Sequence, residues 1–437
     1  MRYKRTSVYA RGKLSMNRLM YSDYSAQKDR VILHCDLNNY FASVELLEKP
    51  ELREKPVIVG GSTENRHGIV LAKNYTAKAF GIMTGESVSN ALGKCPSLTI
   101  LEPHYDKYLS YSRAVREIYK RYTDLVEAMG IDECFLDVTG SGYLFGSGVR
   151  IANEIRESVK RETGLTISAG VSFNKIFAKL GSDMKKPDAV TVISRDDFQE
   201  KIWNLPANEM LGVGMKTYKK LWYRGIRTIG DIANCDPDRM QTYLGKMGQV
   251  LWVYANGYEN SPVMQENERC PIKSIGHGTT TTADLDTERE VFDTIIELSE
   301  EIGTKLRKNR LKSCGVAVGI RENDLSVREY QMKFAHPTQL TRDVARGAMQ
   351  VFRDKHVWRC PIRSVTVRAI YISAEDEPEQ LTIFDEYAWH GELLRLEKTV
   401  DAIREQYGDH SITSGAYLRN KKLNSQRIGF RDHSEIY

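Results

Sequence analysis

The chain has 437 residues, of which 41% are hydrophobic and 28% charged, and its 63 Lys and Arg side chains outnumber its 58 Asp and Glu side chains by five. This composition is that of an ordinary globular chain with room for three or four domains, and it excludes an intrinsically disordered protein. No apolar run approaches the length of a membrane span, and the small positive excess permits nucleic-acid binding through local patches without requiring it.

Seven cysteines are scattered along the chain and form no Cys-x-x-Cys pair, so their spacing predicts neither a zinc site nor a disulfide framework. Reduced thiols in a cytoplasmic protein are the simplest interpretation. Residues 1–28 are polar and basic and contain no apolar signal-peptide core. We interpret them as an N-terminal extension that is either flexible or an arm touching DNA.

An apolar run at residues 31–37 predicts the first strand, and it carries Asp36 near its C-terminal end. A run of this kind fits a buried central strand that delivers the acid to one edge of a sheet. Apolar residues with helix-compatible spacing follow from Tyr40 onward. A second short strand, residues 56–61, ends in two glycines.

Two adjacent carboxylates, Asp132 and Glu133, lie between apolar residues at the start of a strand-like run, and Gly130 before them predicts a tight turn after a strand at 125–129. Burying such charges costs several kcal/mol unless they are paired or bound to a cation. A turn-capping Asp and a metal ligand are at this point equally good interpretations. Side chains alternate along a strand, so both acids can serve one metal cluster only if the backbone bends at the hairpin.

Asp36 supplies a third carboxylate, and this favours the metal site. Hard oxygen ligands suit Mg²⁺ or Mn²⁺. Two such ions held side by side are the usual equipment for phosphoryl or nucleotidyl transfer. Around these acids, helices predicted at 104–122 and 149–162 alternate with a strand at 165–171, and we expect an antiparallel sheet to hold the three carboxylates.

From Trp203 the pattern becomes helical. Residues 211–221, which begin Leu-Gly-Val-Gly, indicate a helix-hairpin-helix whose glycines let backbone N–H groups approach a DNA phosphate. Gly212, Gly214 and Lys216 are the predicted DNA contacts, and they are not sequence-specific because phosphates carry no base information.

After a polar, proline-bearing linker, the order of predicted elements is strand, helix, strand, strand, helix, strand. This order suggests a ferredoxin-like sheet with its helices on one face. The strands lie near 273–282, 314–321, 328–334 and 362–373, and the helices near 287–308 and 341–354. The start of the first strand offers small donors suited to phosphates, although an exposed β-edge would explain them equally well: Lys273, Ser274, Gly276 and Thr279.

The tail begins with an acidic, flexible spacer at 375–379 and includes an amphipathic helix at 392–406. Residues 411–431 contain five basic residues and no acid, and we expect them either to touch DNA or to be disordered.

Several of these segments, in this order, resemble the Y-family of translesion DNA polymerases, and most closely its bacterial DNA polymerase IV-like (DinB/UmuC-type) branch. The catalytic motifs of that family are matched by the segments Asp36–Glu45 and Gly130–Glu133, and a further match is Ser172–Pro187. The similarity runs from about Val31 to Phe384, which is most of the chain.

The resemblance implies an α+β, right-hand polymerase fold with a small fingers domain. Its expected parts are an N-terminal extension (1–28), a palm (29–39 and 103–194), fingers (40–102), a helix-hairpin-helix thumb (195–262), a linker (263–271), a ferredoxin-like little finger (272–374) and a tail (375–437). A small fingers domain makes few contacts with the nascent base pair, which implies low fidelity and tolerance of damaged templates.

It also implies roles for individual residues. Asp36 and Asp132 would each bind both of two Mg²⁺ ions, for which Mn²⁺ can substitute, Glu133 would hold the ion that activates the primer 3′-hydroxyl, and the carbonyl of Leu37 would add a ligand. The expected nucleotide contacts are Tyr40, the steric gate Phe41, Tyr75, Lys78 and Lys186. We expect Lys179 to cap its helix or to face DNA. Taken alone, Phe41 would be read as a core residue and Lys78 as part of an amphipathic surface helix.

Two positions depart from the family pattern. Ala72 stands where the family often has Thr or Ser, so a hydroxyl contact to phosphate is missing or is replaced by Lys73. Lys78 stands where Arg is frequent, and Lys offers a point charge in place of a bidentate fork.

In the tail, Gln380, Leu381, Ile383 and Phe384 match the anchors of the family's sliding-clamp-binding pentapeptide. The implied partners are therefore primer-template DNA, deoxynucleoside triphosphates and a sliding clamp, with no membrane and a monomeric enzyme. A metal-dependent nuclease is the rival enzyme, but the fingers lysines and the steric gate have a purpose only with a nucleotide substrate. A non-catalytic DNA-binding scaffold predicts lost acids, whereas all three are present.

Overall fold

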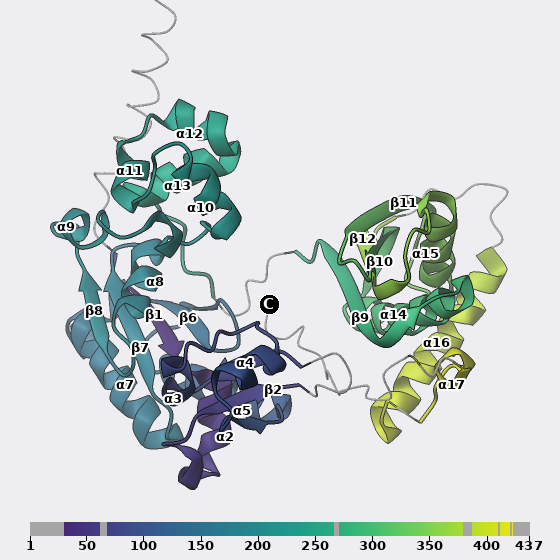
Figure 1. The fold of residues 1–437 in the computed structure, drawn as a ribbon, viewed down its shortest axis with the longest axis horizontal. Coiled ribbons are helices and arrows are strands. Elements are labelled where there is room, and N and C mark those ends of the chain that lie inside the picture. The colour runs from purple at the N-terminus through teal and green to yellow at the C-terminus, as the bar shows by residue number, and fades with distance from the viewer. Residues whose placement is uncertain are drawn as a thin grey trace, which may run out of the picture.

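The structure, a computed structural model, describes residues 30–61, 68–265, 271–378, 387–409, 411–419 and 422. The predicted N-terminal extension and the pentapeptide at 380–384 lie outside these residues. Figure 1 shows the palm, fingers and thumb segments as one body and the little finger, with the C-terminal helices, as a second.

The palm is built on a five-stranded sheet with the order β5-β6-β1-β7-β8. The central strand β1, Ile32–Leu37, is buried at all six residues, as its apolar run predicts. Its neighbours β6 (Glu133–Asp137) and β7 (Ile167–Ser172) both pair with it antiparallel. The predicted antiparallel sheet is confirmed for the strands that hold the acids, but β8 (Val190–Ile193), which was not predicted, is parallel to β7. Helix α8, Lys175–Met184, connects these two strands as a crossover, and a crossover is what a parallel pair requires.

Strand alternation sorts the residues of the palm sheet between two layers. Leu33, Cys35 and Leu37 belong to the core formed with α5 (Tyr105–Tyr119) and α7 (Gly148–Thr163). Ile32 instead packs with Phe135 and with Ala178 of α8 on the opposite face. His34 and Asp36 have the same parity as Ile32, so their side chains lie on the face covered by α8.

The fingers form a small unit of their own. Their sheet has the order β3-β2-β4, with β2 at Val57–Gly60, β3 at Val70–Lys73 and β4 at Thr99–Leu101. Helix α2 (Tyr40–Leu47) leads into this unit, and α3 (Tyr75–Ala79) and α4 (Val88–Lys94) belong to it. The apolar core of the fingers is a compact group of eight buried residues, far fewer than in the palm. This unit is therefore small, as the sequence predicts.

The thumb is helical, with α9 at Phe198–Ile202, α10 at Met215–Trp222, α11 at Ile229–Asn234, α12 at Pro237–Leu244 and α13 at Lys246–Ala255. Its core is continuous with α8, because Phe173, Phe177 and Leu180 belong to the same buried cluster as Leu221 and Leu251. Helix α8 therefore touches the palm sheet with one side and the thumb with another.

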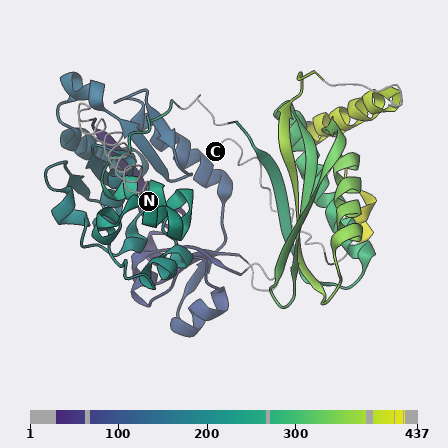
Figure 2. The same ribbon diagram turned by 90° about the horizontal axis from the view of Figure 1, so that it is seen from above.

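The little finger has the predicted order of elements: β9 Ser274–Leu285, α14 Glu288–Lys308, β10 Leu311–Glu322, β11 Val327–Thr338, α15 Thr341–Lys355 and β12 Ile362–Ala374. The sheet has the order β11-β10-β12-β9, and all neighbours are antiparallel. Strands β9 and β10 are thus parallel to each other with β12, the last strand, between them. Figure 2 shows both helices on one face of this sheet.

The tail contains a polar clasp that the sequence did not predict. Helix α16, Tyr387–Tyr407, is longer than the predicted 392–406 and runs along the helices of the little finger (Figure 1). Buried Arg307 of α14 bonds to Glu397 and, at 2.5 Å between Nε and Oδ2, to Asp401 of α16. Arg404 pairs with Glu300 at 2.8 Å. A second short helix, α17 (Gly415–Arg419), places Arg419 2.5 Å from the buried Asp293.

In the described part of the chain, no helix combines the length and the apolar character needed to cross a membrane. Six of the seven cysteines lie in the described part of the chain, and none of these six forms a disulfide bond there; they are Cys35, Cys95, Cys134, Cys235, Cys314 and Cys360.

The contact between α8 and β7 depends on one glycine, and it gives a prediction. A Cβ on Gly170 would lie 1.9 Å from the carbonyl oxygen of Ala178 and 2.6 Å from the amide nitrogen of Ser182. We expect Gly170→Ala to lower the free energy of unfolding by about 1–3 kcal/mol, because α8 must move off the sheet. Gly93→Ala on α4, where the new Cβ meets nothing within 4 Å, should raise it by about 0.5–1 kcal/mol. Denaturant unfolding of both variants tests this, and equal effects would contradict it.

Candidate active site

Three carboxylates lie where β1 ends and β6 begins. Asp36 of β1 is directly opposite Glu133 of β6 in the strand register. Asp132 lies in the bend just before β6, and its carbonyl oxygen accepts a hydrogen bond from Leu37 N at 3.0 Å. The bend that the two adjacent acids require is therefore present, and it frees Asp132 from the strict alternation of the strand.

Asp36 is paired with a lysine. Lys186 Nζ lies 2.8 Å from Asp36 Oδ2 and 2.9 Å from Asp183 Oδ1. Burial raises the pKa of Asp36 to about 7, and the attraction of Lys186 offsets this only in part. Burial opposes the charge of Lys186, but Asp36 and Asp183 outweigh it and raise the pKa of the lysine. Lys186, which the resemblance places at the triphosphate, thus also offsets the charge of one of the three carboxylates.

Glu133 is held by two residues whose role the sequence analysis missed. Lys179 Nζ lies 2.7 Å from Glu133 Oε2, and His34 Nε2 lies 3.6 Å from the same oxygen. Burial alone would raise the pKa of Glu133, but His34 and Lys179 together lower it. The expectation that Lys179 caps a helix or faces DNA did not include this pair with Glu133. Strand alternation was the signal for His34, which lies two residues before Asp36 and so shares its face.

The donor set fits divalent metal ions. Among the described residues, no three His, Cys, Asp or Glu side chains are arranged closely enough to hold a metal ion. Three carboxylates and the Leu37 carbonyl nevertheless supply the hard oxygen atoms that such ions prefer. Burial raises the pKa of Asp132 as well as that of Asp36, and Glu133 adds to the effect at Asp132. A bound cation would favour the ionised form of both groups.

Tyr40 and Phe41 begin helix α2 beside the acids. Tyr40 is buried, and its hydroxyl donates to the carbonyl of Tyr108, so its side chain is committed to the core. Phe41 is half-buried and stacks on Tyr108, with ring centroids 4.2 Å apart and planes inclined by 9°. Among the described residues no side chain caps the start of α2, which leaves backbone N–H groups at a helix N-terminus available to an anion.

The fingers residues lie near the same acids. Burial raises the pKa of Tyr75, the charge of Lys186 lowers it and the charge of Asp36 raises it. Tyr75 therefore lies close enough to Asp36, near the C-terminal end of β1, for their charges to interact. Lys78 Nζ lies 5.9 Å from the centre of the Tyr75 ring. Lys73, proposed as a replacement for the missing hydroxyl at Ala72, donates instead to Thr84 Oγ1 at 3.0 Å.

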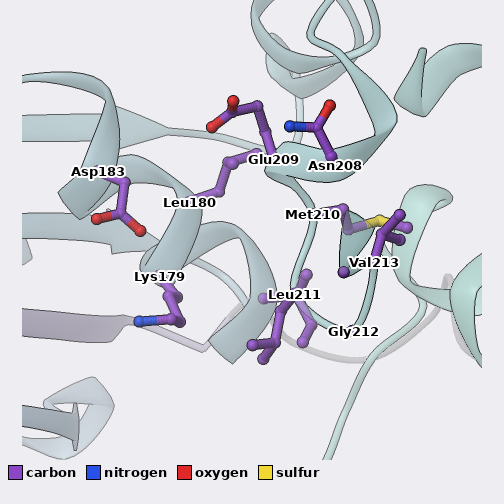
Figure 3. A pocket seen from close by; sticks show the side chains of 11 residues that line it. Lys179, Leu180, Asp183, Asn208, Glu209, Met210, Leu211, Gly212 and Val213 are labelled. Atoms are coloured by element: carbon purple, nitrogen blue, oxygen red, sulfur yellow. The ribbon is translucent and has the colours of Figure 1, made fainter. Parts of the chain in front are cut away.

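The thumb hairpin has the backbone that its glycines predict. Gly212 has φ +90°, and a Cβ there would lie 2.6 Å from Met247 Cε. Gly214 caps α10 without a side chain, and Lys216 follows on the exposed side of that helix. A pocket separates this hairpin from α8, and Figure 3 shows Lys179 and Asp183 on its palm side and Asn208 to Val213 on its thumb side.

The predicted little-finger contacts divide between two faces of β9. This strand lies at the edge of the sheet. Ser274 and Gly276 are exposed on the face away from the helices, and Lys273 precedes them. Thr279 has the parity of buried Ile275, so its side chain lies on the helix-bearing face. The clamp-binding residues Gln380, Leu381, Ile383 and Phe384 lie outside the described residues.

Comparison with known proteins agrees with this geometry. Residues 35–183 match the impB/mucB/samB family, and residues 272–383 match the C-terminal domain of that family. The DNA polymerase IV of Acetivibrio thermocellus is 47% identical over 395 residues, an alignment that covers 90% of this chain and 99% of the relative. The DNA polymerase IV of Clostridium acetobutylicum is 34% identical over 402 residues, covering 90% and 99%.

Among solved structures, a Y-family DNA polymerase chimera, Dbh-Dpo4(243-245)-Dbh, superposes with a TM-score of 0.69 at 23% identity and covers 78% of this chain and 99% of its own. At this identity the likeness speaks for the fold, and it confirms the predicted α+β, right-hand polymerase architecture. The family model over the palm, the close relatives along nearly their whole length and this fold lead to one conclusion. The chain belongs to the impB/mucB/samB family, the Y-family of translesion DNA polymerases, in its DNA polymerase IV-like, DinB-type branch.

Proposed function

We propose that this translesion DNA polymerase extends a primer 3′ end by two-metal-ion nucleotidyl transfer at Asp36, Asp132 and Glu133, with Mg²⁺ as the ion and Mn²⁺ as a substitute. The family requires divalent metal ions. The observation that carries the proposal is the register of β1 and β6, which sets Asp36 opposite Glu133 with Asp132 in the adjoining bend. These oxygen atoms suit Mg²⁺ because it prefers carboxylates and substrate phosphates to nitrogen or sulfur ligands.

The residues would divide the work by position. Asp36 and Asp132, with the Leu37 carbonyl, would hold both ions, and Glu133 would hold the ion that activates the primer 3′-hydroxyl. When bound, the ions activate that hydroxyl and neutralise charge on the triphosphate. Lys186, 2.8 Å from Asp36, is free to move to a phosphate oxygen once its carboxylate is otherwise neutralised. The N-terminus of α2 faces the phosphates with backbone N–H groups.

Nucleotide selection would involve the rings next to the acids. Phe41 lies flat on Tyr108 and so presents a rigid surface on which a deoxyribose can rest. Tyr75 and Lys78 of α3 approach from the fingers. The side chain of Tyr40 is committed to the core, so we assign its substrate contact to its backbone N–H at the start of α2.

The partners follow from the same proposal. Template and primer would contact the thumb hairpin at Gly212, Gly214 and Lys216, and the open face of the little finger near Lys273, Ser274 and Gly276. Thr279 would take part through its backbone, because its side chain lies on the face that bears the helices. A sliding clamp would bind the pentapeptide at 380–384. A monomeric enzyme in the cytoplasm remains our expectation.

We expect Asp132→Asn and Asp36→Asn each to lower primer extension in Mg²⁺ by more than about a hundredfold, because loss of groups that merely orient a metal ligand already costs 10–100-fold. Glu133→Gln should be severe but retain a trace, since Glu133 is expected to touch one ion. Asp137→Asn, at the far end of β6, is the matched control and should extend normally. Near-normal extension by Asp132→Asn, with unchanged circular dichroism, would remove Asp132 from the mechanism.

Phe41→Ala should raise ribonucleotide incorporation relative to deoxynucleotide by at least about tenfold, because the ring that would exclude a 2′-hydroxyl is gone. Phe41→Tyr keeps a ring over Tyr108 and should keep the discrimination. Competitive incorporation of the two sugars measures the ratio. If Phe41→Ala leaves that ratio unchanged, Phe41 is a packing residue and not a steric gate.

Truncating Leu381 and Phe384 to Ala should abolish stimulation by the sliding clamp while sparing extension on a bare primer-template. Tethering to a clamp makes rebinding intramolecular, at an effective concentration of roughly mM for a short linker. Thr382→Ala changes the pentapeptide at a position that is not an anchor and should be stimulated normally. Extension length with and without clamp tests this, and full stimulation of the double variant would show that the anchor lies elsewhere.

A further inference from the structure

Two of the three carboxylates in the site are already paired with a lysine amino group. Lys186 pairs with Asp36, and Lys179 pairs with Glu133 at 2.7 Å. The two partners of the second pair are largely buried, with 16% of the Lys179 side chain and 24% of the Glu133 side chain exposed. A charge-assisted hydrogen bond of this length is among the stronger interactions in a protein. A divalent ion that binds Glu133 must therefore compete with Lys179.

The backbone of Lys179 is fixed by contacts of its own, whereas its amino group is held by the pair with Glu133. Its carbonyl oxygen accepts a hydrogen bond from Ser182 Oγ at 2.7 Å, and Ser182 Oγ lies 2.8 Å from His34 Nδ1. Gly170 brings this turn of α8 into direct contact with β7. The backbone of Lys179 is thus fixed at a distance from which its amino group reaches Glu133. Rotation of the long lysine side chain can end this contact without moving α8.

A second location for the amino group lies beside the first. Lys179 lines the pocket between α8 and the thumb hairpin, together with Asp183 one turn further along α8 and Glu209 of the thumb (Figure 3). Glu209 offers the lysine a new carboxylate after it leaves Glu133, whereas Asp183 already pairs with Lys186 at 2.9 Å between Oδ1 and Nζ. The thumb segment that lines this pocket, residues 208–214, includes the hairpin assigned above to DNA.

We propose that Lys179 is a place-holding cation: in the metal-free enzyme it neutralises and orients Glu133, and it moves toward the palm–thumb pocket when a divalent ion takes its place. Lys179 is then a positioning residue that sets the affinity of the site for metal without ligating it. This inference rests on the proposed function in one respect, the assignment of Glu133 as a metal ligand.

The test measures the affinity of the DNA-free enzyme for Mn²⁺. Electron paramagnetic resonance reports the concentration of unbound Mn²⁺ during the titration. Lys179→Met should bind Mn²⁺ about tenfold more tightly than the wild type, because breaking one charge-assisted hydrogen bond no longer opposes binding. Lys179→Arg keeps the pair and should stay near the wild-type affinity. Lys179→Gln replaces Lys179→Met if the latter does not give a wild-type circular dichroism spectrum.

Lys175 provides a matched control on the same helix. Its Nζ lies 2.6 Å from Glu127 Oε2, and that pair is about as buried as the pair of Lys179 with Glu133, but Glu127 is not one of the three site acids. Lys175→Met should leave the Mn²⁺ affinity unchanged. An equal gain in affinity for Lys175→Met and Lys179→Met would show a general effect of net charge and would overturn the proposal.

The Glu133→Gln variant separates the inference from the function on which it rests. If Glu133→Gln leaves Mn²⁺ binding unchanged, the ligand assignment itself fails. If Glu133→Gln weakens binding but Lys179→Met does not tighten it, the place-holding role alone is rejected. In the double variant Lys179→Met, Glu133→Gln, the gain caused by Lys179→Met should vanish, because the lysine acts through Glu133. A gain that persists there contradicts the proposal.

Discussion

Three carboxylates cannot share one buried corner of a protein unless positive charge accompanies them, and the architecture around Asp36, Asp132 and Glu133 follows from this requirement. The strands must be short and apolar so that they can be buried, yet they must end in acids. In the absence of metal, lysines from α8 and the segment after it supply the compensating charge. In the mechanism proposed above, divalent ions would take over this role from the lysines.

Helix α8 is the element that links this corner to the rest of the enzyme. One of its sides lies against β7, where Gly170 permits backbone contact, and another belongs to the thumb core through Phe177 and Leu180. A helix in close contact with both the sheet and the thumb core cannot shift freely. Protein interiors are close-packed and contain few voids, so a displacement of the helix is transmitted to its neighbours. The three acids and the thumb hairpin are therefore mechanically connected through one short helix.

Much of this site could be predicted from the sequence because it depends on local patterns. The apolar run ending in Asp36, the glycine turn before Asp132 and the glycines of the thumb hairpin each specify their own backbone. The partners of Lys179 could not be predicted in this way, since a long side chain reaches whatever the packing of α8 on the sheet brings near it. The parallel pairing of β7 and β8 was not predicted, because the pattern of a short strand does not indicate its direction relative to a neighbour. The crossover helix α8 between the two strands sets that direction.

The contacts between α14 and α16 could not be predicted for a related reason. Arg307 bonds to Glu397 and Asp401, about ninety positions away, and these contacts are polar, so no apolar periodicity indicates them. Lys398 of α16 also lies 3.2 Å from Glu375, just after β12. The chain therefore leaves the little finger and returns to it at two anchored points. Both ends of the 376–397 segment are therefore fixed to the folded domain, and the entropy of closing this loop is lost when the little finger folds.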